Sequence, residues 1–462
     1  MAIVSSETAG GFPKGFVWGV STSAYQIEGA TREDGREASV WDTFCQREGA
    51  VLSGDTADVT CDHYHRFRED VKLMSEFQVP AYRLSISWPR VMSTDSSQPN
   101  ELGLAFYDAL IDELLAAGIS PWVTLFHWDF PQSRHDQGGW LNPRCVDWFA
   151  EYASTVVERL SDRVTQWITV NEPQCFLHFG HGLGINAPGV KLSLADQLTA
   201  AHHVLLAHGR AVAIIREHAK LPPQVGWAPV GITCSPATED RAHQEAARRA
   251  TMDVKADNLW NNTWFSDPVF LGHYPEEGLR AYGKAAPKYA ASDMQHIAAP
   301  LDFLGLNIYT AMPVESQADG SWSEVSLAPG TARTAFDWPV REECLYWGPK
   351  FHAERYGVPI VITENGMANI DWPARDGRVH DPQRIDYLHR HLLALHRGIV
   401  EGVDVRGYFH WSWMDNFEWA EGFRRRFGLI YVDFESGLRR PKDSAAWYRE
   451  VIRSHGRSLF TE

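Results

Sequence analysis

Short apolar runs recur along the chain, and each ends in polar residues. The runs are four to eight residues long and rich in β-branched and aromatic side chains, a length that suits strands better than helices. Because they are nearly continuously apolar rather than alternating, they fit strands buried on both faces, as in a parallel sheet. The eight runs are residues 16–20, 81–86, 122–126, 166–170, 225–232, 301–306, 360–363 and 405–409.

Amphipathic segments separate these runs. Apolar residues recur at spacings of three and four from Phe106 to Leu115, and the pattern stops at Ala117-Gly118, a glycine signal for a helix end. Residues 64–74 and 385–395 carry similar stripes. Eight strand-helix alternations predict the α/β class, as a single (β/α)8 TIM barrel with long loops at the C-terminal face of the strands. A doubly wound sheet also alternates, but its G-x-G-x-x-G fingerprint is absent after the first run.

No linker, low-complexity tract or sequence repeat divides the chain. We therefore expect residues 1–462 to form one domain. In a barrel of this kind the catalytic groups lie at the C-terminal ends of the strands. Glu172 follows the fourth run and Glu364 the seventh. A lone Glu at a strand end more often caps the next helix, but two at equivalent positions are expected to meet at one mouth.

Composition narrows the class of function. The formal charge of −16 repels a phosphate backbone, and no basic run offsets it, so we expect no nucleic-acid partner. Six widely spaced cysteines without a C-x-x-C pair suit reduced thiols in the cytoplasm. We see neither a signal-peptide pattern nor an apolar run approaching membrane-spanning length, so no membrane association is expected. Nineteen tryptophans offer flat faces that suit sugar rings.

Two facing carboxylates without a metal-ligand cluster suggest glycoside hydrolysis without metal or cofactor. Their spacing stays open between about 5–5.5 Å for a retaining site and roughly 6.5–9.5 Å for an inverting one. Arg83, within a buried run, needs a carboxylate partner, and Glu364 is the natural one. His127 taken alone fits a core histidine. The histidines at 202, 203 and 208 are interpreted as packing residues rather than metal ligands. Cys175 is interpreted as a residue that lines the site wall, because the sequence shows no partner that would make it a nucleophile.

Two motifs match a known family. Residues 169–173, Thr-Val-Asn-Glu-Pro, and 362–366, Ile-Thr-Glu-Asn-Gly, resemble the two catalytic signatures of the family 1 glycoside hydrolases, the β-glucosidase family. The likeness extends from the Phe-Pro-Lys-Gly-Phe-Val-Trp-Gly segment at 12–19 to Arg-Pro-Lys at 440–442. It therefore covers nearly the whole chain and is far more specific than one motif.

The resemblance implies a (β/α)8 barrel and a retaining double displacement without cofactor. Glu172 would be the acid/base and Glu364 the nucleophile, oriented by Tyr309 and the supporting Arg83. Trp338 corresponds to the aglycone tryptophan, and Asn307 belongs to the motif of the sixth strand. The implied sugar-binding residues of the −1 subsite are Gln26, His127, Trp128, Asn171, Trp411, Glu418 and Trp419.

Some positions bear on the substrate. The resemblance implies that Glu418 accepts hydrogen bonds from two sugar hydroxyls and would repel a 6-phosphate, while Glu172 indicates ordinary O-glycosides. Gln174, His181 and Ile308 depart from the residues usual in the family. Residues 36–38 and 342–344 depart as well, and we expect most of these departures to surround the +1 side and to affect the aglycone preference rather than the chemistry.

These observations predict a cytoplasmic, retaining exo-β-glycosidase, foremost a β-glucosidase with some β-galactosidase or β-fucosidase activity. Its expected partners are small carbohydrates, namely β-glucosides, cellobiose-like disaccharides or aryl glucosides. A transglycosidase would use the same glutamates and stays an alternative. A catalytically silent sugar-binding barrel is disfavoured, because both glutamates and the implied −1 residues are present. The oligomeric state is left open.

Overall fold

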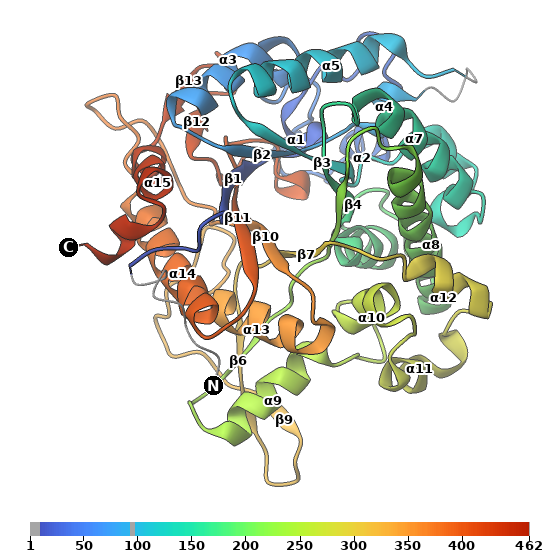
Figure 1. The fold of residues 1–462 in the computed structure, drawn as a ribbon. Helices are drawn as coiled ribbons and strands as arrows, with labels where there is room; N and C mark the ends of the chain where they lie inside the picture. The colour runs from blue at the N-terminus through green and yellow to red at the C-terminus, as the bar shows by residue number, and fades with distance from the viewer. Residues whose placement is uncertain (1–9, 93–97, 462) are drawn as a thin grey trace.

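Eight parallel strands close into a barrel at the centre of the molecule (Figure 1). The structure is a computed structural model that describes residues 10–92 and 98–461. Around the barrel the strands follow chain order, and β1 pairs with β11 to close it. The eight strands are β1 (Val17–Ser21), β2 (Ala81–Ser85), β3 (Ser120–Phe126), β4 (Gln166–Asn171), β5 (Gln224–Ala228), β7 (Phe303–Asn307), β10 (Ile360–Asn365) and β11 (Val405–Trp411).

All eight predicted strands are present, so the predicted (β/α)8 barrel is confirmed. The apolar runs fill both sides of the strands, as expected for a parallel sheet. Inside the barrel, aromatic and aliphatic side chains from successive strands pack into one layer, including Trp122, Ile168, Phe303 and Phe409. The barrel interior is thus a solid core, which leaves only the strand ends free for chemistry.

Long helices cover the outside of the barrel (Figure 1). The apolar stripes predicted for residues 64–74, 106–115 and 385–395 lie in α3, α5 and α14 and face the core. The outer helices are α3 (His63–Glu76), α5 (Glu101–Ala116), α7 (Cys145–Leu160), α8 (Leu194–His218), α13 (Cys344–Tyr356), α14 (Pro382–Val400) and α15 (Asp443–Ser454).

Helix α8 corrects one expectation. Within the part of the chain that the structure describes, it alone is long and apolar enough to cross a membrane by length and composition. From the sequence we expected no apolar run of this length. Polar residues such as His202, His203 and Arg210 interrupt the run, so the pattern was missed. In the structure 67% of the apolar window is buried inside the protein. Its apolar length therefore reflects packing between the barrel and the neighbouring helices α7 and α12 (Ala291–Ile297).

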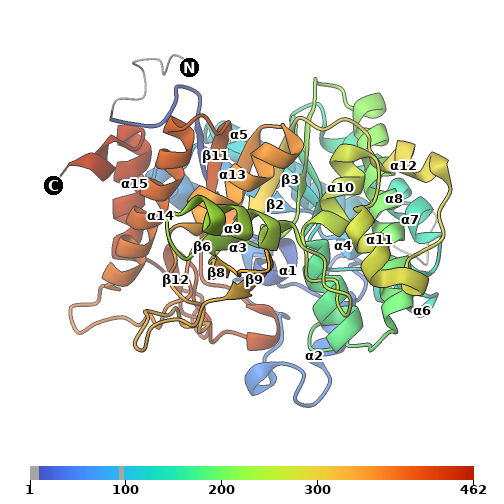
Figure 2. The same cartoon turned by 90° about the horizontal axis from the view of Figure 1, so that it is seen from below.

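Additional elements surround the barrel and extend its loops (Figure 2). A three-stranded sheet, β6 (Cys234–Pro236), β8 (Met312–Ser316) and β9 (Trp322–Glu324), packs against α9 (Arg241–Met252). A hairpin joins β12 (Ile430–Val432) to β13 (Arg439–Pro441), and a π-helix, η3, spans Cys175–Leu183. The remaining helices are α1 (Ala24–Ile27), α2 (Val40–Cys45), α4 (Trp88–Val91), α6 (Gln132–Asp136), α10 (Thr263–Leu271) and α11 (Glu276–Tyr282).

Candidate active site

A cavity of about 970 Å³ opens at the C-terminal ends of the barrel strands. Ten residues singled out from the sequence line it: His127, Trp128, Glu172, Asn307, Tyr309, Trp338, Glu364, Trp411, Glu418 and Trp419. Gln26 and Asn171 are fully buried and are not among the lining residues. The strand ends thus converge on one mouth, and Gln26 and Asn171 contact the lining residues Glu418 and His127.

Glu364 is held by charge and by hydrogen bonds on both carboxyl oxygens. Arg83, on β2, donates from Nη1 to Oε1 at 2.5 Å, and Tyr309 donates from its hydroxyl to Oε2 at 2.7 Å. The predicted pairing of Arg83 with Glu364 is therefore present, with both side chains almost completely buried. Such charge-assisted contacts fix the carboxylate geometry and favour its ionised form.

Glu172 follows the last residue of β4 and has a φ of 44°. This left-handed backbone is uncommon outside glycine, and the amide of Glu172 is held by a 2.8 Å hydrogen bond to the carbonyl of Ala228 at the end of β5. Its Oε1 accepts a 3.0 Å hydrogen bond from Nδ2 of Asn307. The turn therefore places the carboxyl group at the cavity wall, fixed from two neighbouring strands.

Asn307 links the two glutamates. It is the last residue of β7 and lies opposite Glu364 in the register of β7 and β10. Its amide donates to Glu172 and, at 3.0 Å, to Oδ1 of Asn171, which also accepts a 2.5 Å hydrogen bond from Arg83. A chain of hydrogen bonds thus connects Glu364, Arg83, Asn171, Asn307 and Glu172, and both glutamates line the same cavity.

The two carboxyl groups differ electrostatically. Burial, followed by the negative charge of Glu364, raises the pKa of Glu172 to about 8. Burial also raises the pKa of Glu364, but the charge of Arg83 and the hydrogen bonds from Tyr309 and Arg83 oppose this rise. Because only Glu364 has Arg83 and Tyr309 opposing the rise, a proton shared by the pair is favoured on Glu172 over Glu364. A carboxylic acid facing a carboxylate can protonate one atom while the other attacks.

Aromatic side chains form the wall beside the glutamates. Trp128 and Trp419 lie with ring centroids 4.5 Å apart, and His127 is parallel to Trp411 at 5.7 Å. Asn171 donates from Nδ2 to Nε2 of His127 at 3.2 Å, while Nδ1 of His127 has no partner among the described residues. Burial and the charge of Arg83 hold the pKa of His127 well below its usual range, so the ring is neutral.

Glu418 is supported from the first strand. Gln26, in α1 just after β1, donates from Nε2 to the carbonyl of Phe417 at 2.9 Å, to Asn416 Oδ1 at 3.1 Å and to Oε2 of Glu418 at 3.4 Å. Burial, and then the charges of Glu364 and Glu172, raise the pKa of Glu418 well above its usual range. This environment therefore favours the neutral form of Glu418, which can both donate and accept hydrogen bonds.

The sequence reading missed the outer part of the cavity. Its walls come from segments far apart in the chain, and most of the side chains that line it are apolar or aromatic. These side chains are Phe179, Ile185, Trp260, Met312, Trp322, Leu327, Phe336 and Phe427. Apart from Trp338, which the family resemblance identified, the sequence signal for this region was the large number of tryptophans, and it did not identify which of the others reach the cavity.

Three departures from the family pattern lie outside the cavity lining. Gln174, His181 and Ile308 are buried, and none is among the residues lining the main cavity. Gln174 accepts from the amide of Val230 and donates to the carbonyl of Asn261, while Ile308 packs behind Gly231. These three side chains therefore do not line the cavity, and Gln174 and Ile308 contact the lining residues Val230, Asn261 and Gly231 from behind.

Neither carboxylates, histidines nor cysteines gather into a metal-binding group in the part of the chain that is described. The mouth holds Glu172 as an acid, Glu364 as a carboxylate and His127 as a neutral imidazole, together with several tryptophan side chains. A barrel with paired glutamates arranged in this way defines the class of the glycoside hydrolases.

Comparison with known proteins identifies the family within that class. The chain matches Glycosyl hydrolase family 1 over residues 8–457 and belongs to that family. It is 42% identical over 450 residues to β-glucosidase A of Thermotoga maritima, covering 96% of this chain and 98% of that protein. A bifunctional β-D-glucosidase/β-D-fucosidase of Bifidobacterium breve is 42% identical over 473 residues, with coverage of 96% and 98%.

Solved structures agree with this assignment. The β-glucosidase of T. maritima in complex with glucoimidazole superposes with a TM-score of 0.89 at 42% identity, covering 97% of this chain and 100% of that chain. The same T. maritima enzyme in complex with deoxynojirimycin gives the same TM-score and identity.

Proposed function

We propose that this protein is a retaining exo-β-glucosidase in which Glu364 is the nucleophile and Glu172 the acid/base. One observation carries the proposal: Asn307 binds Glu172 and lies opposite Glu364 in the strand register, yet only Glu364 has a cation and a phenol holding it as a carboxylate. Membership of family 1, a retaining family, favours direct attack by Glu364 over the wider spacing that admits a water molecule.

In the first step Glu364 attacks the anomeric carbon, and the bond from that carbon to the leaving oxygen breaks as Glu172 transfers its proton to this oxygen. In the second step Glu172, now ionised, removes a proton from water, and the water oxygen displaces Glu364 from the anomeric carbon. The restored proton on Glu172 and the free carboxylate of Glu364 complete the cycle. Arg83 and Tyr309 hold the nucleophile in place throughout.

A neutral sugar ring requires many polar partners and a flat apolar face. We propose that the unpaired Nδ1 of His127, the carboxyl group of Glu418 and the amides of Gln26 and Asn171 bind its hydroxyls, with Trp411 as the platform. This set suits terminal β-glucosyl residues and, through the likeness to the B. breve enzyme, β-fucosyl residues as well. Glucose-like inhibitors of the kind bound in the T. maritima structures are expected to occupy the same subsite.

The outer part of the cavity bears on the leaving group. Trp260, Trp322 and Trp338 offer stacking surfaces there, and Asn186, Asp253, Lys255 and Glu324 offer hydrogen-bond partners. An aryl group can stack on the rings, and a second sugar can also pair its hydroxyls. We therefore propose that aryl β-glucosides and cellobiose-like disaccharides are both substrates.

The test of the function is turnover of an aryl β-glucoside by the wild-type protein and by Glu364→Gln. We expect release of the phenol by the wild type and a loss on the order of 10³-fold or more in the variant, with the fold retained. Glu354→Gln, an exposed glutamate of α13, serves as the matched control. A silent sugar-binding barrel would show no turnover in the wild type, and substantial activity of Glu364→Gln would overturn the nucleophile assignment.

We also propose a cytoplasmic location, supported by the six cysteines, all of which are free and buried. Cell fractionation followed by an activity assay tests it. Activity confined to the extracellular or periplasmic fraction would contradict it.

A further inference from the structure

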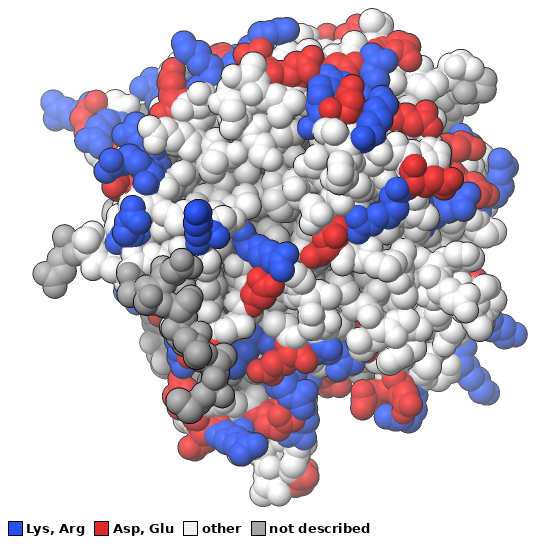
Figure 3. All heavy atoms as spheres, in the orientation of Figure 1, with Lys and Arg blue, Asp and Glu red and all other residues white. Residues whose placement is uncertain are grey.

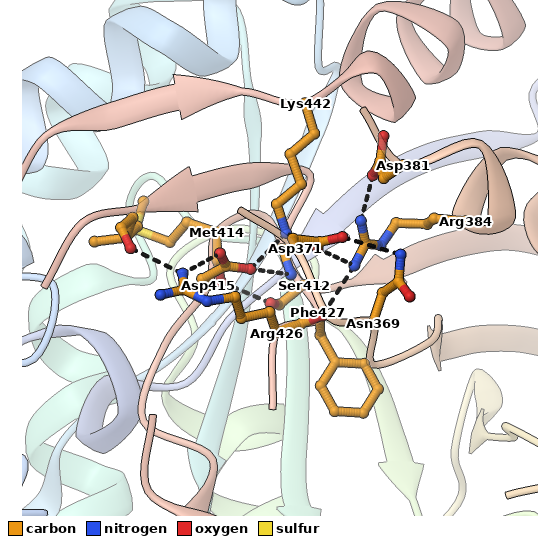
Figure 4. Close-up of polar contacts among 12 residues, drawn as sticks. Asn369, Asp371, Asp381, Arg384, Ser412, Met414, Asp415, Arg426, Phe427 and Lys442 are labelled. Carbon is orange, nitrogen blue, oxygen red and sulfur yellow. Dashed lines mark hydrogen bonds and ion pairs between the residues drawn. The ribbon is translucent and has the colours of Figure 1, made fainter. Parts of the chain in front are cut away.

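A cluster of buried charges lies behind the sugar-binding loops (Figure 4). It contains three carboxylates and three cations, so its formal charges balance. The members of this cluster, here called the ion cluster, are Asp371, Asp381, Arg384, Asp415, Arg426 and Lys442. None of them lines the active-site cavity.

Lys442 is at the centre of the ion cluster. Its fully buried Nζ lies 2.6 Å from Oδ2 of Asp371 and 2.7 Å from Oδ1 of Asp415. In Figure 4 the lysine side chain reaches down between these two carboxylates. Arg384 binds the same Oδ2 of Asp371 at 2.7 Å, and Arg426 binds Oδ2 of Asp415 at 2.7 Å. Lys442 is therefore the only residue of the cluster bonded to both Asp371 and Asp415.

The two bridged carboxylates belong to different active-site loops. Asp371 lies in the segment after β10, seven residues beyond Glu364, and Asp415 lies in the segment after β11, three residues before Glu418. From Asp415 the contacts continue directly to the sugar-binding side chains. Asn416 accepts from Gln26 at 3.1 Å, and Gln26 in turn reaches Glu418.

We propose that Lys442 is a positioning residue, which sets the place of Glu418 in the sugar subsite by bridging Asp371 and Asp415. The inference rests on the proposed function, in which Glu418 binds sugar hydroxyls. Because Glu418 is expected to repel a 6-phosphate, we take the 6-hydroxyl to be one of them. Lys442 belongs to β13–α15 rather than to either loop and contacts no part of the cavity.

The physical reason is the cost of unpaired buried charge. Without the ammonium group of Lys442, the negative charges of Asp371 and Asp415 are balanced by one cation fewer. The carboxylate oxygens that bonded to it also lose a hydrogen bond in a site closed to water. Separation of the two carboxylates relieves this repulsion. Asp415 is three residues before Glu418, and its neighbour Asn416 accepts a hydrogen bond from Gln26, which also reaches Glu418, so movement of Asp415 displaces Glu418.

The test compares wild type, Lys442→Met and Lys442→Arg on an aryl β-glucoside and on the corresponding β-xyloside, which lacks the hydroxymethyl group. In Lys442→Met we expect KM for the glucoside to rise about tenfold or more, with a smaller fall in kcat, because a hydrogen bond to a charged partner is typically worth a factor of this size. The xyloside should change less than about threefold. Lys442→Arg, which keeps the charge, should recover most of the glucoside preference.

Asp267→Asn is the matched control, since Asp267 is equally buried and pairs with Arg355 away from the ion cluster. It should lower thermal stability and leave the glucoside-to-xyloside ratio unchanged. If Lys442→Met does not fold, Arg426→Gln removes a partly exposed member of the cluster and should shift the ratio in the same direction by less.

The positioning role would be overturned if a folded Lys442→Met lost equal activity on the glucoside and the xyloside. The same holds for Arg426→Gln if that variant replaces it. Absence of glucoside turnover in the wild type would instead overturn the proposed function. The two failures are therefore distinguishable.

Discussion

At the scale of single residues, Glu172 and Glu364 show how neighbours assign roles to chemically identical side chains. Both are buried and each is close to the other, so burial alone would raise both pKa values. Of the two glutamates, Arg83 and Tyr309 contact only Glu364, and this asymmetry leaves the proton on Glu172. The sequence indicated the pair because each Glu follows a strand, but the direction of the asymmetry depends on contacts from two other strands.

Replacing Glu172 with Ala removes the proton donor and keeps the nucleophile. Activated phenols leave with little protonation, so their glycosylation should slow by less than about tenfold, whereas poorly activated alcohols should lose roughly 10²–10⁴-fold. A series of aryl and alkyl β-glucosides measures this as a steeper dependence of kcat/KM on leaving-group pKa. Losses that are equal across the series would contradict the acid role.

Cys175 offers a second test of the proposal that Glu172 carries the catalytic proton. Its thiol donates a hydrogen bond to Glu172, which lowers the pKa of that carboxyl group. Activity requires protonated Glu172 and therefore falls as pH rises through about 8, the pKa of Glu172 in the intact site. In Cys175→Ala this basic limb of kcat/KM should move to higher pH.

Cys175→Ser keeps a donor and should not move the limb upward. Cys344→Ala, which removes a buried thiol in α13, is the control. If Ala and Ser at position 175 moved the limb in the same direction, the hydrogen bond would not be the cause.

At the scale of elements, two buried helical glycines lead to opposite expectations. A Cβ on Gly209 in α8 would overlap the carbonyl oxygen of His296 in α12, because the two helices touch through this position. A Cβ on Gly398 in α14 would meet nothing closer than a ring carbon of Tyr346 at 3.7 Å, an ordinary contact. Close packing therefore requires glycine at the first position but not at the second.

Gly209→Ala should lower the free energy of unfolding by about 1–3 kcal/mol, since overpacking outweighs the gain in helix propensity. Gly398→Ala should raise it by about 0.5–1 kcal/mol, since only the propensity term remains. Denaturant unfolding of both variants beside the wild type measures the two values. Stabilisation by Gly209→Ala would show that α8 and α12 do not pack as closely as described.

The elements themselves differ in how far the sequence predicts them. Barrel strands are buried on both faces, so they stand out as apolar runs, and the predicted bounds agree to within about two residues except for β5, which ends at Ala228 before Pro229. Strands β6 and β9 have three residues each and carry no comparable pattern. The outer cavity walls were not predicted, because η3, β9 and the segment around Trp260 are far apart in the sequence and meet only in the folded protein.

At the scale of the whole molecule, barrel closure ties the beginning of the chain to its end. β1 pairs with β11, the amide of Phe12 donates to the carbonyl of His455, and Tyr448 donates to the carbonyl of Gly19. Acidic and basic side chains are interspersed over the face shown in Figure 3. Because the two ends complete one barrel, we propose that residues 1–462 form a single domain.

Binding of a glucose-like inhibitor tests this proposal together with the site. Ligand at 100 times its Kd stabilises the folded state by about 2.7 kcal/mol. For 462 residues the unfolding entropy is roughly 1 kcal/mol per kelvin, so Tm should rise by about 3 °C. A single domain predicts one calorimetric transition that shifts as a whole, and Glu418→Gln should reduce the shift at the same inhibitor concentration. Two transitions, of which only one responds to the inhibitor, would show that the barrel does not unfold as one unit.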